Sequence, residues 1–294
     1  MTVLSAEDVD PQALRDAFNA AFADYLIGPM TIAAEGWPVL LARQGARLSA
    51  SRVVTDGAGQ VLAFALVAPL AQHRTRLATM GARPEARGAG HAPRLLDLVI
   101  GEARTRGDRT MELEVFARNA RALALYRSRG FETVAELHGY TRRPGEPAAA
   151  ATDRIDEGGQ ADAVAWLEAC GVDGLPFQLG AQSIASVATP VKAWRCAGAQ
   201  VVFSDADPTR IVVLSLVDAD ARQHGSRQLS RALAAHYPQA VLRMPQLLRP
   251  DRGGDALAGE GWTREPLHQL LLRRSLRGAP AGAAPRSDGG QSDA

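Results

Sequence analysis

The 294-residue sequence lacks an excess of charge of either sign. It has 33 lysine and arginine residues against 32 aspartate and glutamate residues, and its formal net charge is +1. Proteins that bind nucleic acid mainly through its phosphates carry a strong basic excess. The composition therefore predicts no nucleic-acid partner.

Cysteine is scarce. Only Cys170 and Cys196 are present, 26 positions apart, with no C-x-x-C pair and no histidine at a spacing typical of a zinc site. We expect two reduced, buried thiols and no metal.

Long hydrophobic runs are also missing. The longest, residues 61–71 (VLAFALVAPLA), is far short of the roughly 20 apolar residues that cross a bilayer, and it is better interpreted as a buried strand. The first ten residues are acidic where a signal peptide has basic and then apolar residues. These absences predict a soluble, cytoplasmic protein with no membrane partner.

The length of the chain suggests two domains. Residues 142–153 are rich in proline, glycine and alanine without an apolar period, which places a boundary near the middle of the chain. We therefore predict domains at residues 1–145 and 153–274. Residues 275–294 lack a face that can pack, and we expect them to form a disordered tail.

Apolar periodicity predicts the elements of the first half. We expect helices at residues 11–25 and 32–44, a meander of strands at 51–56, 59–69 and 74–82, a helix ending near residue 106, a strand around 109–119, a helix over 120–129 and a final hairpin over 131–142. Asn119 is a plausible N-cap of the helix that follows it, and Gly130 is the residue expected just past the end of that helix.

The glycine-rich stretch PEARGAGHAPRLL lies between the third strand of the meander and a helix. A helix N-terminus exposes unpaired N–H groups, and small residues let an anion approach them closely. Arg87 and Arg94 add positive charge on either side. The spacing fits neither a Walker A motif nor GxGxxG, so we expect a phosphate or pyrophosphate that belongs to neither ATP nor NAD, unless the segment is simply a turn.

A longer match extends this interpretation. MGARPEARGAGHAPRLL followed by LEVFARNARALALYRSRGF resembles the GNAT family of N-acyltransferases, with Arg87, Gly90 and Ala92 at the defining positions of the family's Q/R-x-x-G-x-G/A pyrophosphate motif. The resemblance covers roughly residues 13–142. It implies an α/β fold in which a mixed, mostly antiparallel sheet is flanked by helices.

The resemblance also implies an acyl donor, acetyl-CoA or another acyl-CoA, and an amine acceptor attacked directly without a covalent enzyme intermediate. The resemblance implies that the following residues bind the pantetheine arm and the pyrophosphate of the cofactor: Met80, Gly81, Ala82, Arg87, Gly88, Ala89, Gly90, His91, Ala92, Asn119 and Tyr126.

Acyl transfer to an amine needs an acid for the leaving thiolate and a base for the ammonium. The resemblance places Tyr126 beside the CoA sulfur as the acid. It makes Glu114 the base, acting through a water, with Glu112 on the same strand face as the alternative. The competing interpretations are core packing for Tyr126, a solvated strand face for the glutamates and helix capping for Asn119. Four aromatic residues either line the acceptor groove or, as their helical spacing favours, pack in the core: Phe18, Phe22, Tyr25 and Trp37.

The second half echoes the first. The distance from Arg87 to Gly130 is 43 positions, and that from Arg222 to Gly261 is 39. We therefore predict tandem domains of similar fold. Arg227 stands where the loop calls for glycine or alanine, and its side chain is expected to obstruct the backbone amides. Leu257 stands where the first copy has Tyr126. We therefore expect a degenerate second copy that braces the first or shapes its acceptor pocket.

The sequence thus predicts an N-acetyltransferase. The alternative is a non-catalytic acyl-CoA binding or sensing protein, which would need neither Tyr126 nor Glu114. A small-molecule amine and a peptide N-terminus both remain open as acceptors, and a homodimer is possible.

Overall fold

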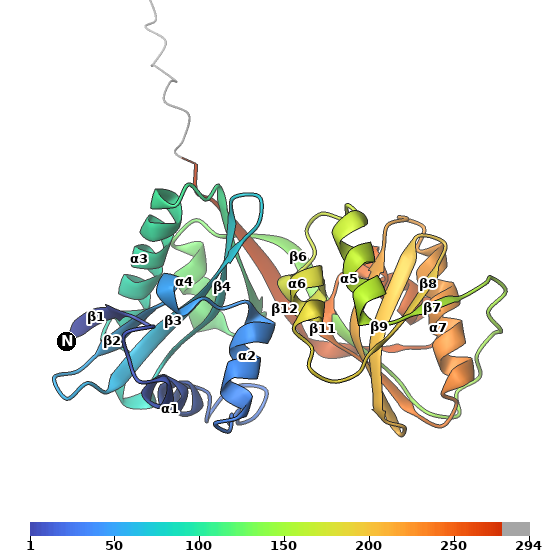
Figure 1. Ribbon diagram of the computed structural model, residues 1–294, viewed down its shortest axis with the longest axis horizontal. Helices are drawn as coiled ribbons and strands as arrows, with labels where there is room; N and C mark the ends of the chain where they lie inside the picture. The colour runs from blue at the N-terminus through green and yellow to red at the C-terminus, as the bar shows by residue number, and fades with distance from the viewer. Residues whose placement is uncertain (278–294) are drawn as a thin grey trace, which may run out of the picture.

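The computed structural model describes residues 1–277 and joins twelve strands from both halves of the chain into one open sheet (Figure 1). In the first half the strands are β1 (Thr2–Ser5), β2 (Arg52–Thr55), β3 (Val61–Leu70), β4 (Arg74–Ala82), β5 (Thr110–Phe116) and β6 (Glu132–Arg142). In the second half they are β7 (Asp156–Gly158), β8 (Lys192–Cys196), β9 (Ala199–Asp207), β10 (Arg210–Asp218), β11 (Val241–Leu248) and β12 (Thr263–Ser275).

Helices flank this sheet. Those of the first half are α1 (Pro11–Ala21), α2 (Gly36–Gln44), α3 (His91–Thr105) and α4 (Ala120–Arg127), with 3-10 turns η1 (Leu48–Ala50) and η2 (Pro84–Ala86). Those of the second half are α5 (Gln160–Ala169), α6 (Ala181–Ala185), α7 (His224–His236) and α8 (Gly254–Gly259), with η3 (Phe177–Leu179) and η4 (Pro250–Arg252). No helix in the described part of the chain is long and apolar enough to cross a membrane.

The strand order is β1-β2-β3-β4-β5-β12-β6-β11-β10-β9-β8-β7. Neighbouring strands in the described sheet are antiparallel except for two parallel pairs, β4 with β5 and β10 with β11. The predicted α/β class and mostly antiparallel sheet are therefore confirmed. So are the three-strand meander and the buried face of α3, whose Leu95, Leu96, Val99, Ile100 and Ala103 are all buried.

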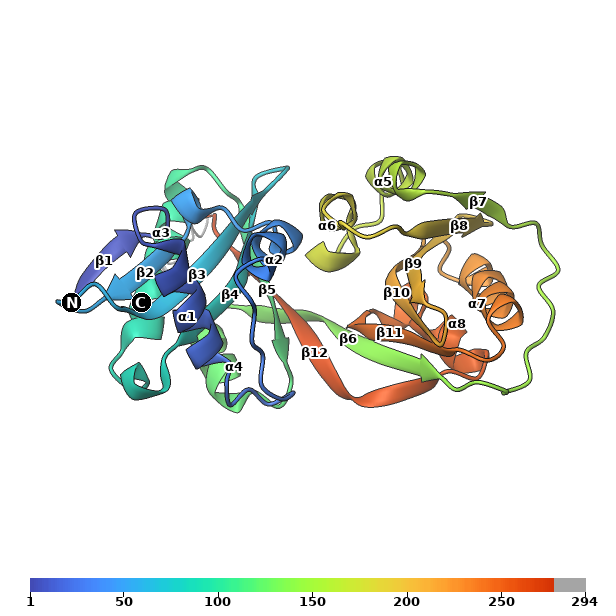
Figure 2. The same ribbon diagram turned by 60° about the horizontal axis from the view of Figure 1, so that its bottom comes forward.

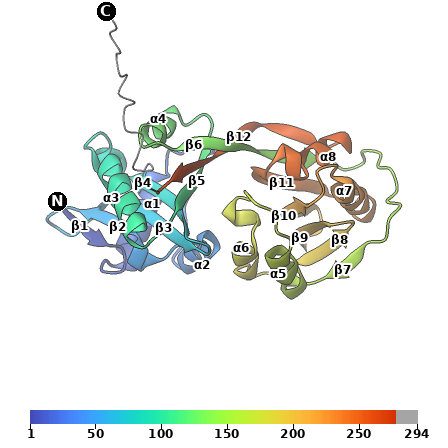
Figure 3. The ribbon, with the colours of Figure 1, turned by 90° about the horizontal axis from the view of Figure 1, so that it is seen from above.

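Two long strands exchange between the halves (Figure 3). The last strand, β12, lies between β5 and β6, with Leu272 opposite Leu113, so the C-terminal segment completes the sheet of the first half. In turn β6 continues into the second half, where Tyr140 pairs with Met244 of β11. The predicted hairpin over residues 131–142 is therefore wrong. This segment is a single strand, because its partners come from far along the sequence.

The predicted linker after β6 contains no helix or strand between Arg142 and β7, and Figure 2 shows it running around the outside of the second half. The predicted tail begins too early. Ser275 ends β12, and the Leu276 amide donates to the Arg109 carbonyl oxygen at 2.8 Å while the Leu276 side chain is buried. The rest of that prediction, residues 278–294, lies outside the described residues.

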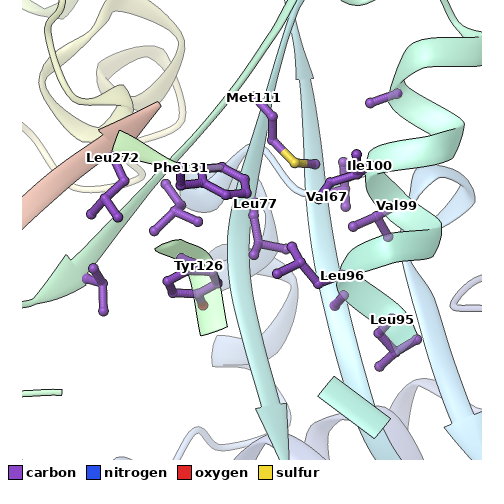
Figure 4. Packing of buried hydrophobic residues seen from close by; sticks show 14 of the residues in the cluster. Val67, Leu77, Leu95, Leu96, Val99, Ile100, Met111, Tyr126, Phe131 and Leu272 are labelled. Carbon is purple, nitrogen blue, oxygen red and sulfur yellow. The ribbon is translucent and has the colours of Figure 1, made fainter. Parts of the chain in front are cut away.

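The core of the first half forms where α3 and α4 pack on the central strands (Figure 4). Leu270 and Leu272 of β12 belong to the same cluster as Leu113 and Leu123. Burial of a leucine side chain contributes about 1.5–3 kcal/mol. The first half therefore depends on the last strand of the chain for its own core.

Candidate active site

A cleft of about 660 Å³ lies between the end of α1, the end of β4 and the N-termini of α3 and α4. Nine of the eleven residues predicted to bind the cofactor line it: Met80, Gly81, Ala82, Arg87, Gly88, Gly90, Ala92, Asn119 and Tyr126. The other two, Ala89 and His91, do not line it, and the His91 side chain is buried. We call this space the cofactor cleft.

The loop before α3 presents its backbone amides without internal partners. Gly88 has a φ of 87° and Gly90, the N-cap of α3, has a φ of 80°, conformations that favour glycine. No side chain caps the helix, and within the described residues the amides of residues 88–92 donate to no protein acceptor. Five free N–H groups in and just before the first turn of a 15-residue helix suit an anion.

Arg87 does not point a free charge into this loop. Its guanidinium forms a two-pronged ion pair with Asp24, with Nη2 to Oδ1 at 2.7 Å, and it also donates to the Ala21 carbonyl oxygen at 3.0 Å. The hydrogen bond from Arg87 lowers the pKa of the Asp24 carboxyl group. Arg87 therefore ties the loop to the end of α1.

Two other arginines supply positive charge to the cleft. Arg118 and Arg121, on either side of Asn119, line the cofactor cleft, whereas Arg94 is exposed and does not. Sequence reasoning missed both residues. Their signal was present, because FARNAR places two cations around a predicted N-cap at the edge of the motif.

A second cavity of about 370 Å³ adjoins the cofactor cleft, and we call it the acceptor cavity. The two spaces share six lining residues: Phe22, Tyr25, Met80, Asn119, Ala122 and Tyr126. Phe18 also lines the acceptor cavity, whereas Trp37 is buried in the core and does not. A ligand in either space can therefore reach Tyr126.

Tyr126 lies on α4 with its ring 5.9 Å from that of Phe131 (Figure 4), and the residue is buried. Burial raises the pKa of the Tyr126 phenol, with a smaller contribution from Tyr25. The group is therefore neutral at physiological pH and keeps a proton to donate. Asn119 caps α4 as predicted, because its Oδ1 accepts from the Ala122 amide at 3.1 Å.

Glu114 lies in a buried ion pair rather than on the open strand face that one interpretation of the sequence offered. Its Oε2 is 2.7 Å from Nη2 of Arg76 on β4, and both side chains are at most 3% exposed. Glu114 lines the acceptor cavity. Arg76 was missed, although an arginine inside an apolar strand signals a buried partner.

Glu112 lines neither cavity. It is buried between Arg74, at 3.7 Å, and Arg273 of β12, at 3.4 Å. Burial raises the pKa of the Glu112 carboxyl group against the opposing effect of the arginines. The structure therefore gives Glu112 no access to an acceptor.

The second half contributes part of the acceptor cavity. Five of its residues line the space, and they come from η3, β11 and β12: Gln178, Pro245, Gln246, Leu247 and Gln269. The halves also touch where α2 meets η3 and α6, with the Ser183 hydroxyl donating to the Arg43 carbonyl oxygen at 3.4 Å.

The corresponding loop of the second half is closed by its own carboxylate. Asp218, fully buried at the end of β10, accepts from the Ser226 amide in the first turn of α7 at 2.8 Å. Gly225 is buried against the Cys196 carbonyl oxygen. The Arg227 guanidinium, expected to obstruct the loop, instead donates to the Arg222 carbonyl oxygen. Leu257 is buried in α8.

Comparison with known proteins is consistent with this geometry. Residues 12–131 match the model of the acetyltransferase (GNAT) family, and no curated protein matches the chain. A GCN5-related N-acetyltransferase from Anabaena variabilis is 13% identical with a TM-score of 0.66, covering 94% of this chain and 73% of its own. One from Sphaerobacter thermophilus is 14% identical with a TM-score of 0.60, covering 94% and 96%. A third, from Kribbella flavida, is 18% identical with a TM-score of 0.59, covering 93% and 70%.

These structures share the fold across nearly the whole chain, the exchanged second half included. The family match to the first half supports acyl transfer in general as its chemistry.

Proposed function

We propose that the first half is an N-acetyltransferase that moves an acetyl group from acetyl-CoA to a primary amine in a ternary complex. The observation that carries the proposal is the meeting of two cavities at Tyr126, one of which ends at a loop of unpaired amides. Two substrates held on either side of one proton donor are what direct transfer requires.

The donor would lie in the cofactor cleft. Backbone N–H groups of residues 88–92 suit its pyrophosphate, while Arg118 and Arg121 are placed to balance its phosphate charge. Met80, Gly81 and Ala82 line the path from the loop toward Tyr126, where the thioester would be held. Arg87 would not need to bind the pyrophosphate itself, because its guanidinium holds the loop against the end of α1 instead.

The reaction then balances without a covalent enzyme intermediate. The amine nitrogen attacks the thioester carbonyl carbon, the C–S bond breaks, and the Tyr126 hydroxyl gives its proton to the departing thiolate. The proton lost from the attacking nitrogen restores the phenol by way of solvent. Because burial keeps Tyr126 protonated, the acid is ready at neutral pH.

Glu114 is proposed to act on the acceptor, directly or through a water, as a hydrogen-bond acceptor that orients the amine. Its ion pair with Arg76 fixes the position of its side chain at the cavity. The surrounding apolar walls disfavour an ammonium, so the amine is driven toward its neutral, nucleophilic form by desolvation. A strong base is then unnecessary.

The second half is proposed to be a degenerate copy that neither binds acyl-CoA nor catalyses. Asp218 occupies the amide of α7 that an anion would need, and Leu257 offers no proton. Its contribution is instead structural, through β12, and local, through the residues that it places in the acceptor cavity.

Titration calorimetry with acetyl-CoA, followed by thiol release from acetyl-CoA with a panel of amines, tests the proposal. We expect one binding site per chain and amine-dependent thiol release. If acetyl-CoA binds but no amine leads to thiol release, the protein is better explained as a non-catalytic acyl-CoA sensor. If no acyl-CoA binds, the proposed function is wrong.

A further inference from the structure

The floor of the acceptor cavity is an ion pair between Arg76 and Glu114, and neighbouring groups hold its guanidinium in place. Arg76 Nε donates to Glu114 Oε2 at 2.8 Å, and Nη1 donates to the Gln44 carbonyl oxygen at 3.1 Å and to Gln44 Oε1 at 3.0 Å. Nη2 lies 2.7 Å from Glu114 Oε2. We assign the Gln178 amide in the orientation that gives both of its atoms a hydrogen-bond partner, in which its oxygen accepts from Nη2 at 2.8 Å. Four of the five guanidinium N–H donors are thus hydrogen-bonded, and the positive charge is already paired with Glu114, so the guanidinium is not free to bind a substrate carboxylate.

The second half holds this pair in place. The Phe177 ring covers the Arg76 guanidinium, with 5.1 Å from Cζ to the ring centroid. The next residue, Gln178, bridges both charges, because its amide nitrogen donates to Glu114 Oε1 at 3.2 Å while its oxygen accepts from Arg76. Both carboxylate oxygens of Glu114 are therefore engaged, and the floor has no net charge.

The rest of the cavity offers no charge either. Among the described residues that line it, Arg76 and Glu114 are the only two with charged side chains. Six apolar or aromatic residues of the segment from α1 to α2 also line it: Phe18, Phe22, Tyr25, Ile27, Met30 and Leu40. A further charge buried here would lose its hydration without gaining a partner, which costs several kcal/mol.

We infer that the acceptor is a primary monoamine whose remaining part is uncharged and apolar, and that Gln178 is a positioning residue that keeps the floor of the cavity neutral. The inference rests on the proposed function, and it excludes polyamines, amino acids and other acceptors that would bury a second charge. The second half therefore takes part in substrate selection although it has no active site of its own.

Three acceptors of equal chain length test the inference: hexylamine, 1,6-diaminohexane and 6-aminohexanoate. They end in a methyl group, an ammonium and a carboxylate. With the full-length protein and acetyl-CoA, kcat/KM for thiol release should be at least about tenfold higher for hexylamine than for either charged acceptor. A preference for 1,6-diaminohexane or for 6-aminohexanoate, or thiol release with neither hexylamine nor another apolar monoamine, would overturn the inference.

A variant tests the role of Gln178. Gln178→Glu places a second carboxylate on the floor, so the ratio of kcat/KM for 1,6-diaminohexane to that for hexylamine should rise by at least about tenfold. Gln12→Glu makes the same charge change on an exposed residue of α1 and should leave the ratio within about twofold of wild type. An unchanged ratio in soluble, acetyl-CoA-binding Gln178→Glu would show that Gln178 does not set the charge preference.

Failure of the inference and failure of the proposed function give different results. If acetyl-CoA does not bind in calorimetry, the proposed function is wrong. If acetyl-CoA binds and a charged acceptor is used best, the function stands and the assignment of the acceptor class is wrong.

Discussion

In each half a strand is followed by a loop and a helix, β4 by α3 and β10 by α7, but the starts of the two helices differ. Before α3, two glycines with positive φ leave the amides of residues 88–92 open to a cleft. Before α7, the buried carboxylate of Asp218 accepts from the Ser226 amide. A helix N-terminus is thus open to an external anion only when the protein supplies no acceptor of its own.

The two halves also depend on each other structurally. The sheet of the first half contains β12, and the acceptor cavity contains residues of η3 and β11. The second half, whose helix start is closed by Asp218, therefore supplies a strand and cavity-lining residues that the first half lacks. Variants that remove the second half, block the open loop or remove Asp218 test these roles and the contrast between the two helix starts separately.

Removal of the second half should have the largest effect. Deleting residues 153–294 takes β12 away from β5 and removes Leu270 and Leu272 from the core of the first half. We expect no cooperative thermal unfolding and little soluble protein. A variant lacking only residues 153–262, with β12 rejoined by a flexible linker, should recover part of the cooperativity. A truncated first half that melts like the full chain would contradict the exchanged-strand account.

Gly90→Glu should abolish binding of acetyl-CoA, with a loss of affinity of more than about 100-fold in calorimetry. The substitution strains a φ of 80° and puts a carboxylate at the amides that would hold the pyrophosphate. Gly57→Glu makes the same change at an exposed turn without positive φ and should bind normally. Equal affinities for acetyl-CoA in the two variants would show that the loop before α3 does not bind the cofactor.

Tyr126→Phe should lower kcat by about 10- to 1000-fold while the affinity for acetyl-CoA stays within about twofold, because only the proton donor is lost. Tyr237→Phe, in the second half, removes a hydroxyl that bonds Asp205 and should leave kcat nearly unchanged. Since burial raises the pKa of Tyr126, its ionisation should not limit the wild-type rate below about pH 10. Normal turnover in Tyr126→Phe would show that Tyr126 only packs in the core and does not donate a proton.

Asp218→Ala should lower the free energy of unfolding by about 1–3 kcal/mol, because the Ser226 and Asp220 amides both lose a charged acceptor. Denaturant unfolding measures this loss, and Asp173→Ala, at an exposed position, serves as the matched control. Calorimetry should still count one acetyl-CoA per chain. A second binding event would show that Asp218 alone separates the two loops.

Glu112→Gln should have the smallest effect. The pKa of Glu112 is raised in the folded protein by burial, so the folded state keeps a proton that the unfolded state loses above pH 4.5. Wild-type stability should therefore fall as pH rises from 4.5 through the folded pKa, and the variant should lack this slope, with a difference below about 1 kcal/mol. Turnover should be unaffected. A large loss of turnover would return Glu112 to the role of base.

Local patterns predicted the parts of the site that depend on local structure. The glycines before α3, the Asn119 cap and the residue Gly130 after α4, whose φ is 75°, follow from capping and turn preferences. The apolar stripe of α3 follows from helical periodicity. Tyr126 then falls at the meeting of the cavities because the spacing along α4 is fixed by the helix.

The parts that depend on distant contacts could not be predicted in this way. The hairpin expected at residues 131–142 has its partner in β12, and strand pairing over such a distance leaves no local pattern. Gln178 and Gln246 reach the acceptor cavity only through that exchange. In the sequence, Asp218 is an acidic residue at the end of a strand, and its hydrogen bond with the first turn of α7 is evident only in the folded chain.

The number of acetyl-CoA sites per chain tests the central contrast most directly. Titration calorimetry on the full-length protein, repeated with Gly90→Glu and with the double variant Arg222→Ala/Arg227→Ala, should give one site, no site and one site. Two sites in the wild type, binding that survives Gly90→Glu, or binding lost with the arginines of the second half would contradict the assignment of the open loop to the first half alone.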